Sequence, residues 1–251
     1  MEKAKTIDEV IQQLDNIIED CIATNNRMGL FAYVYRRTTA EIAKEIDLGH
    51  FQDNQRMEIF DVKFANLYLM AYHNYNNHLP LSKSWQFAFD ATDEKLTIIQ
   101  HILFGMNAHI NLDLSIATAR TMDGQDIKDI EADFNKVNDI LQNITNELQD
   151  RLSKVSPLLF LVDLFGENTD EKIIDFSMRK ARSQAWNSAN LLWSLGEEHS
   201  DNSIKEIDDF VTKLSQIIKS PKSFLFRLLL KSIAFFETKS VDIVITKLRT
   251  N

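Results

Sequence analysis

The chain has 251 residues, of which 44% are hydrophobic and 26% are charged, and this is enough to bury a sizeable core in one domain. It contains only six glycines and three prolines, which argues against turn-rich β folds and favours helices, because helix interiors exclude both residues. The formal net charge of −9 disfavours binding to nucleic acids and to anionic membrane surfaces.

The single cysteine, Cys21, rules out an internal disulfide bond and is typical of a protein from a reducing compartment. The first residues lead into a polar helix without the apolar region of a signal peptide. No apolar run reaches the length of about 18 residues that a membrane span needs. The sequence therefore predicts a cytoplasmic protein with no membrane span.

Apolar residues recur at three- and four-residue spacing in a series of segments, which is the pattern of amphipathic helices. Thr6 and Glu9 form a capping box before the first segment, and Asp53 caps the third. In chain order, the predicted helices cover about residues 7–23, 27–48, 54–74, 83–89, 93–119, 127–148, 169–195, 204–218 and 224–236, and a tenth through Leu248 is optional. A short apolar segment, 158–165, lies between the sixth and the seventh.

These segments predict an all-α fold, with a single domain over residues 1–251 that forms a bundle of about nine to ten helices. The helix at about 93–119 is apolar on most sides, which is typical of a helix surrounded by others. We therefore expect this helix to lie at the centre of the bundle.

The central helix carries an unusual polar run, Gly105–Leu114, with the sequence G-M-N-A-H-I-N-L-D-L. Buried polar groups need partners or a chemical role. His109 and Asp113 are four residues apart, about 6 Å along the axis, so they can reach one metal ion or each other. His101 lies about 12 Å from His109 along the same axis and joins such a site only with difficulty. Gly105 leaves a gap where a ligand or another helix can approach closely.

Asp61 is predicted to face the core from the preceding long helix, beside Phe64 and Tyr68. It is the best candidate for a further carboxylate at the His109 and Asp113 site. The competing interpretation is an ion pair between Asp61 and an arginine, for which the candidates are Arg36, Arg37 and Arg182.

The candidate substrate-binding residues are amide, aromatic or cationic side chains expected near this site: Asn107, Asn111, Asn66, Tyr68, Tyr35, Arg182 and Trp186. Arginines beside large aromatic residues can bind a carboxylate or a phosphate. In the alternative interpretation the arginines pack along the aromatic rings, and the asparagines only fix the register of packed helices.

The string G-M-N-A-H-I-N-L-D-L, with Phe31–Thr38, Asp61–Tyr68 and Arg182-x-x-x-Trp186, resembles a family of uncharacterised bacterial all-helical proteins known as a domain of unknown function. The resemblance covers roughly residues 28–195 and implies a single all-α domain, but no reaction. The pair His109-x-x-x-Asp113 is also similar to the metal pair of the all-α zinc-dependent phospholipase C and nuclease family. That similarity implies a divalent metal such as zinc, for which the candidate ligands here are His109, Asp113, Asp61 and His101.

Three functions remain open at this point. In the first, the protein is an enzyme acting on a small molecule or a lipid, as a metal-assisted hydrolase or through His109 as a base, with Asp113 and Asp61 as the other catalytic residues. In the second, it is a helical pocket for an apolar ligand such as a lipid or an isoprenoid. In the third, it is a structural or interaction protein whose polar residues only hold helices together. The apolar segment 224–230 is either a homodimer face or a buried closing helix.

Overall fold

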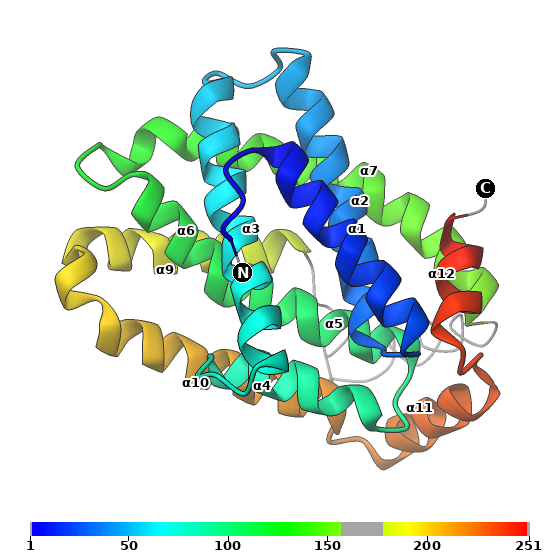
Figure 1. The fold of residues 1–251 in the computed structure, drawn as a ribbon. Helices are drawn as coiled ribbons and strands as arrows, with labels where there is room; N and C mark the ends of the chain where they lie inside the picture. The colour runs from blue at the N-terminus through cyan, green and yellow to red at the C-terminus, as the bar shows by residue number, and fades with distance from the viewer. Residues whose placement is uncertain (1, 157–177, 250–251) are drawn as a thin grey trace.

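The computed structural model describes residues 2–156 and 178–249. In these two ranges all regular structure is helical, which confirms the predicted all-α class (Figure 1). The apolar segment 158–165 and the start of the helix predicted from residue 169 lie outside the described residues. Among the described residues, no helix is both long enough and apolar enough to span a bilayer.

The first four helices begin where short polar side chains can accept from free backbone amides. They are α1 (Ile7–Ala23), α2 (Met28–Asp47), α3 (Asn54–Asn76) and α4 (Lys83–Asp90). Thr6 accepts from the backbone N–H of Glu9, and Asp53 accepts from that of Arg56, as the sequence predicts. After α2, Gly49 adopts a left-handed backbone conformation with φ of +71°, which turns the chain toward α3.

The predicted central helix begins later than expected and is not one continuous α-helix. It comprises α5 (Ile98–Ala108), a π-helical turn (His109–Asp113) and α6 (Leu114–Thr121), preceded by a short 3-10 helix (Ala91–Asp93). Thr97 and Gln100 form a capping box that sets the start of α5 at Ile98 rather than near Asp93. The prediction of a continuous helix from 93 was therefore wrong at its start and across the π-helical turn.

The second half of the chain also folds into helices: a 3-10 helix (Ile127–Ile130), α7 (Glu131–Val155), α9 (Met178–Leu195), a 3-10 helix (Glu197–His199), α10 (Asp201–Lys219), α11 (Phe224–Phe236) and α12 (Val241–Arg249). Helix α7 runs further than the predicted 127–148, whereas α11 has the predicted bounds.

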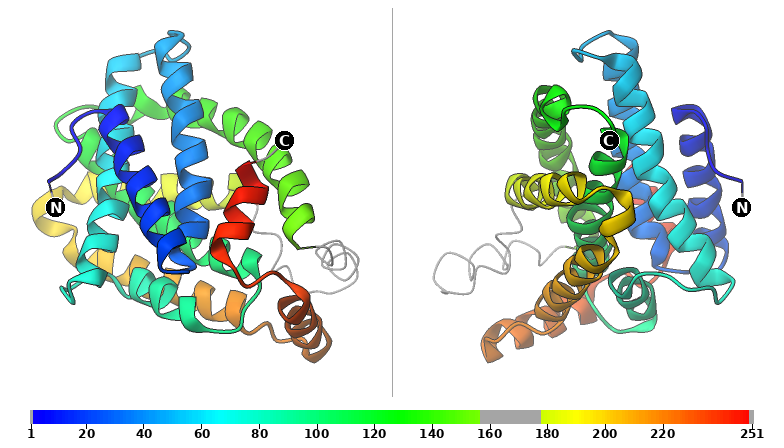
Figure 2. Two further views of the ribbon diagram at one scale, coloured as in Figure 1. Left: turned by 45° about the vertical axis from the view of Figure 1, so that its right-hand side comes forward. Right: turned by 90° about the vertical axis from the view of Figure 1, so that its left-hand side faces the viewer.

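The segment from α5 to α6 lies in the middle of the structure, as its apolar composition predicts. It contacts α2, α3, α4, α9 and α10. In the right-hand view of Figure 2, α1 lies on one side of this segment, beyond α3, and α9 lies on the other. The main hydrophobic core draws side chains from Ala4 to Leu248 and surrounds the π-helical turn. The polar run of the central helix is therefore held in a predominantly apolar interior.

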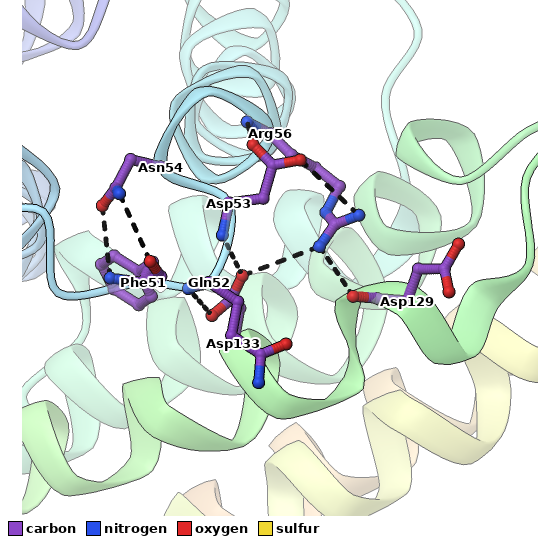
Figure 3. Close-up of polar contacts among 7 residues, drawn as sticks. All are labelled: Phe51, Gln52, Asp53, Asn54, Arg56, Asp129 and Asp133. Atoms are coloured by element: carbon purple, nitrogen blue, oxygen red, sulfur yellow. Dashed lines mark hydrogen bonds and ion pairs between the residues drawn. The ribbon is translucent and has the colours of Figure 1, made fainter.

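Long-range contacts from buried carboxylates fix the starts of three helices. Figure 3 shows Asp133 of α7 beneath the loop that leads into α3, where its two carboxylate oxygens accept from the backbone N–H groups of Gln52 and Asp53 at 2.7 and 3.0 Å. In the same way, Asp208 of α10 accepts from two amides at the start of α4, and Glu237 accepts from the first amide of α5. A carboxylate at a helix N-terminus satisfies free N–H groups and interacts favourably with the helix dipole.

Candidate functional site

The π-helical turn places His109 and Asp113 side by side in the protein interior. The backbone N–H of Leu114 donates to the carbonyl of His109, the five-residue spacing of a π turn. His109 Nδ1 lies 3.0 Å from Asp113 Oδ2, and both residues are 3% exposed. Single π turns within α-helices occur frequently at functional sites.

Trp85 of α4 completes this arrangement from a neighbouring helix. Its indole N–H donates to the same Oδ2 of Asp113, at 2.9 Å. Burial raises the pKa of Asp113, and the Trp85 hydrogen bond opposes that rise because it stabilises the ionised carboxylate. When Asp113 is ionised and accepts from both neighbours, the His109 proton is on Nδ1 and Nε2 carries the free lone pair.

Aromatic rings surround the His109 imidazole and keep it neutral. Phe64 stacks on it, with ring centroids 3.7 Å apart and planes 10° from parallel, and Tyr35 lies edge-on at 4.3 Å. This burial lowers the pKa of His109 well below its usual value of 6.5. His109 Nε2 is buried and has no hydrogen-bond partner. His109 is therefore a neutral imidazole at neutral pH, with one buried ring nitrogen that no hydrogen bond satisfies.

The predicted gap at Gly105 is filled by Phe31 of α2 rather than by a ligand. A Cβ atom added at Gly105 would lie 2.3 Å from Phe31 Cγ. The glycine therefore allows close packing between α5 and α2, and the Phe31 ring in turn contacts His109 at a centroid distance of 5.8 Å.

A cavity of about 60 Å³ lies against His109, between α2, α3, α7 and α9. Its lining is mostly apolar, with four groups of chemical interest: Tyr35, Asp61, His109 and Arg182. Asp61 is 3% exposed and its Oδ2 has no hydrogen-bond partner, and burial raises the pKa of this carboxyl to about 7. Burial raises the pKa of Tyr35 well above 10, so its hydroxyl stays protonated.

Arg182 brings a buried positive charge to the same cavity. Its Nε donates to the Asn138 side-chain oxygen at 2.7 Å, one terminal nitrogen donates to the Phe134 carbonyl at 2.6 Å, and the guanidinium stacks over the Phe134 ring. The side chain is 3% exposed, and burial lowers its pKa to about 9, so it remains charged at neutral pH. Arg182 forms no ion pair with a carboxylate among the described residues.

The predicted alternative, in which Asp61 is paired with an arginine, is not what the structure shows. Arg36 pairs with Asp15, with its Nε 2.8 Å from the carboxylate, and Arg37 pairs with Glu41 of its own helix. Arg182 lines the same cavity as Asp61, but no ion pair joins them among the described residues. Asp61 and Arg182 thus contribute a carboxyl and a guanidinium to one cavity without an ion pair between them.

Several predicted substrate-binding residues lie outside this cavity and make structural contacts. Asn107 donates to the carbonyl of Val211 and to Ser215 on α10, and Asn111 donates to Asn107. Asn66 exchanges hydrogen bonds with the backbone of Ala4 and anchors the segment before α1. For these asparagines the alternative interpretation, a role in helix packing, agrees with the observed contacts.

Two aromatic residues from the same prediction also lie beyond the cavity lining. Tyr68 is fully buried beside Trp85, with ring centroids 5.1 Å apart, and Trp186 packs on Phe134 at 5.0 Å. Of the predicted substrate-binding residues, Tyr35 and Arg182 are the two that line the cavity.

The arrangement does not fit the metal site implied by the phospholipase C resemblance. Across residues 2–156 and 178–249, no three His, Cys, Asp or Glu side chains lie together in a way that could hold an ion. His109 and Asp113 face each other through the atoms that would bind it, and His101 lies 2.8 Å from an Arg27 guanidinium nitrogen. We therefore derive no step that depends on a metal.

Two features of the site have no clear sequence signal. The role of Trp85 as the donor to Asp113 depends on how α4 packs near the π-helical turn. The two residues are 28 positions apart in the sequence, so no local pattern predicts the pair. The insertion of Phe31 at Gly105 is equally non-local, although a glycine within an apolar helix suggests a close approach of some kind.

Comparison with known families agrees with the sequence resemblance to a domain of unknown function. Residues 7–221 match the family of unknown function DUF5995. The chain belongs to this family. Neither a curated protein nor a solved structure matches the sequence. The DUF5995 match includes every residue of the cavity lining, so the site lies within the part that defines the family.

Proposed function

We propose that this member of DUF5995 is a hydrolase that uses general acid–base catalysis on a small substrate carrying an acidic group. One observation carries the proposal. His109 is in contact with Asp113 through Nδ1, its Nε2 has no hydrogen-bond partner, and it lines a cavity that also holds Asp61 and Arg182. One oxygen of Asp61 has no hydrogen-bond partner, and Arg182 forms no ion pair with a carboxylate of the described residues.

His109 is the proposed base. As water attacks the acyl carbon of an ester, Nε2 takes one of its protons, and the imidazolium that forms is stabilised by the Asp113 carboxylate. The Trp85 hydrogen bond holds that carboxylate in position. Because the ring is enclosed by Phe64 and Tyr35, solvent does not compete for Nε2.

Asp61 is the proposed acid, and Tyr35 the proposed donor to the developing oxyanion. A carboxyl with a pKa of about 7 is protonated in part at neutral pH and can give its proton to the departing alkoxide. The proton held by His109 then returns to the Asp61 carboxylate by way of the product alcohol or the next water molecule in the cavity, so the net reaction is ester plus water to acid plus alcohol. The buried Tyr35 hydroxyl stays protonated and can donate a hydrogen bond to the oxyanion.

Arg182 is the proposed anchor for the acidic group of the substrate. A buried guanidinium without a carboxylate partner favours an anion, and its planar array of donors fits a carboxylate or a phosphate. The apolar remainder of the lining, which includes Val34, Ile42 and Met106, suits a short hydrocarbon body. The cavity volume of about 60 Å³ restricts that body to a few carbon atoms.

The test is a comparison of two matched esters, monomethyl succinate and methyl butyrate, with hydrolysis followed in a pH-stat. We expect monomethyl succinate to be the better substrate, because only it carries a carboxylate for Arg182. His109→Gln should lower kcat/KM by roughly 10²–10⁴, the usual contribution of a general base. The matched control is His199→Gln, because His199 is exposed and lies outside the cavity lining. No hydrolysis of either ester, or equal rates for wild type and His109→Gln, would contradict the proposal.

A second candidate function is supported by the apolar share of the cavity lining. Eight of its thirteen residues are Phe, Val, Ile, Met or Leu. An apolar pocket with a few polar groups is also typical of a ligand-binding protein. In that case the same ligands would bind without turnover, and His109→Gln would change affinity rather than rate.

A further inference from the structure

Helix α11 presents an apolar face that the rest of the described chain does not cover. Phe235, Phe224, Phe236 and Leu225 are 74%, 69%, 66% and 65% exposed, and these are the four most exposed large hydrophobic side chains in the described ranges. Leu228, at 53%, lies on the same face. A continuous exposed apolar surface of this kind marks a contact with a protein or a membrane.

The spacing of these residues gathers them on one side of the helix. At about 100° per residue, Phe224, Leu228 and Phe235 fall within a stripe about 40° wide, and Leu225 and Phe236 form a second stripe beside it. The opposite side carries the buried Phe226, Leu230 and Ile233. Helix α11 lies at the edge of the described part of the molecule, as Figures 1 and 2 show.

The charge around this face is opposite to that of the protein as a whole. Exposed Lys222, Lys231 and Lys239 lie on α11 or next to its ends, together with the half-buried Arg227. Helix α11 itself contains no acidic residue, and Glu237 just after it is 7% exposed and accepts from the Ile98 amide. The net charge of −9 belongs to other parts of the chain, and charges more than about 10 Å away are largely screened at physiological salt.

We propose that α11 binds the surface of an anionic lipid bilayer, with its apolar face among the headgroups and its lysines against the lipid phosphates. Exposed Phe and Leu with flanking Lys and Arg are the pattern of helices that lie in the interface plane. A second copy of the chain is a poorer partner, because a two-fold dimer through this face would bring both sets of lysines together. The proposal is independent of the cavity, since α11 begins after residue 221, where the family match ends.

Vesicle flotation of the full chain tests whether α11 binds anionic bilayers. The vesicles contain phosphatidylcholine alone or phosphatidylcholine with 30% phosphatidylserine. We expect binding to the anionic vesicles, at least tenfold weaker binding to the neutral ones, and loss of binding in 0.5 M salt. The triple variant Phe224→Ser, Leu228→Ser, Phe235→Ser should lose at least tenfold in affinity. The control Leu48→Ser, Ile59→Ser, Leu79→Ser removes apolar residues that are 46–55% exposed elsewhere and should bind as the wild type does.

A second pair of variants tests whether binding requires the lysines around α11. Lys222→Gln, Lys231→Gln, Lys239→Gln should bind anionic vesicles at least tenfold more weakly, while Lys3→Gln, Lys128→Gln, Lys205→Gln, which removes exposed lysines elsewhere, should not. Circular dichroism confirms that each variant keeps its helix content. Equal binding to both vesicle types, or equal effects of the α11 and control variants, would overturn the proposal. So would a wild-type dimer that fails to bind vesicles and becomes monomeric in the Phe224, Leu228 and Phe235 variant.

Discussion

Replacing Asp61 by Asn should make the protein more stable, and the gain should grow with pH. The pKa of Asp61 rises from 3.8 to about 7 because the carboxyl is buried without a hydrogen bond to one oxygen. Between these values the unfolded chain has already lost the proton and the folded protein still holds it. The free energy of unfolding therefore falls as pH rises from about 4 to about 7.

The size of this change in stability follows from the pKa shift of Asp61. A difference of about three pKa units corresponds to about 4 kcal/mol, of which about 2.5 kcal/mol develops between pH 5 and pH 7. Asn has nearly the same size and no charge to bury, so the Asp61→Asn variant should lack this pH dependence. Its stability relative to wild type should increase by about 2.5 kcal/mol from pH 5 to pH 8.

Urea denaturation at pH 5, 6, 7 and 8 measures this difference directly. Asp123→Asn is the control, because Asp123 is exposed and its replacement should change stability little at any of these pH values. A difference between Asp61→Asn and wild type that stays constant, or that shrinks as pH rises, would refute the reasoning. Such a result would mean that Asp61 ionises in the folded state as an exposed carboxyl does.

Three further substitutions test the contacts around the site. Gly105→Ala should destabilise the protein by about 1–2 kcal/mol in chemical denaturation, because crowding against Phe31 outweighs the gain in helix propensity of about 1 kcal/mol. A more stable variant would contradict the close packing of Phe31 on Gly105. Asp133→Asn should cost about 2–3 kcal/mol in the same assay through weaker bonds to two backbone amides, and an unchanged midpoint would count against that anchor. Trp85→Phe should raise the pKa of Asp113 further, as read from its carboxyl 13C shift, whereas a lowered pKa would show that Trp85 is not its donor.

Most of the fold could be predicted because it is encoded locally. Thr6, Asp53 and the apolar spacing of each segment lie next to the helices that they define, and the observed starts of α1 and α3 agree with them. The start of α5 was placed too early, although Thr97 and Gln100 form a capping box that the sequence contains. The single-domain organisation stays a prediction.

The long-range anchors could not be predicted. Asp133, Asp208 and Glu237 look like ordinary acidic residues of amphipathic segments, and each caps a helix that is 80 or more residues away in the chain. The same applies to Asn66, whose partner is the backbone of Ala4. A residue type states which hydrogen bonds it can form, but only the tertiary fold decides which backbone it meets.

Part of the candidate site could be predicted from the sequence, and part could not. His109, Asp113 and Asp61 were singled out because polar residues in an apolar helical pattern need a reason to be there, and the structure buries all three. The π-helical turn was missed because spacing arguments assume 3.6 residues per turn. Asn107 and Asn111 satisfy each other and α10, which their sequence pattern allows as readily as a substrate contact.

The protonation state of His109 tests the central claim most directly. Long-range proton–nitrogen NMR spectra of the 15N-labelled protein report which imidazole nitrogen carries the proton. We predict a neutral His109 with hydrogen on Nδ1 and a free lone pair on Nε2, unchanged as pH falls from 8 through 6.5, because burial lowers its pKa. A proton on Nε2 at pH 7, or titration near pH 6.5, would contradict the assignment of His109 as a buried, oriented base.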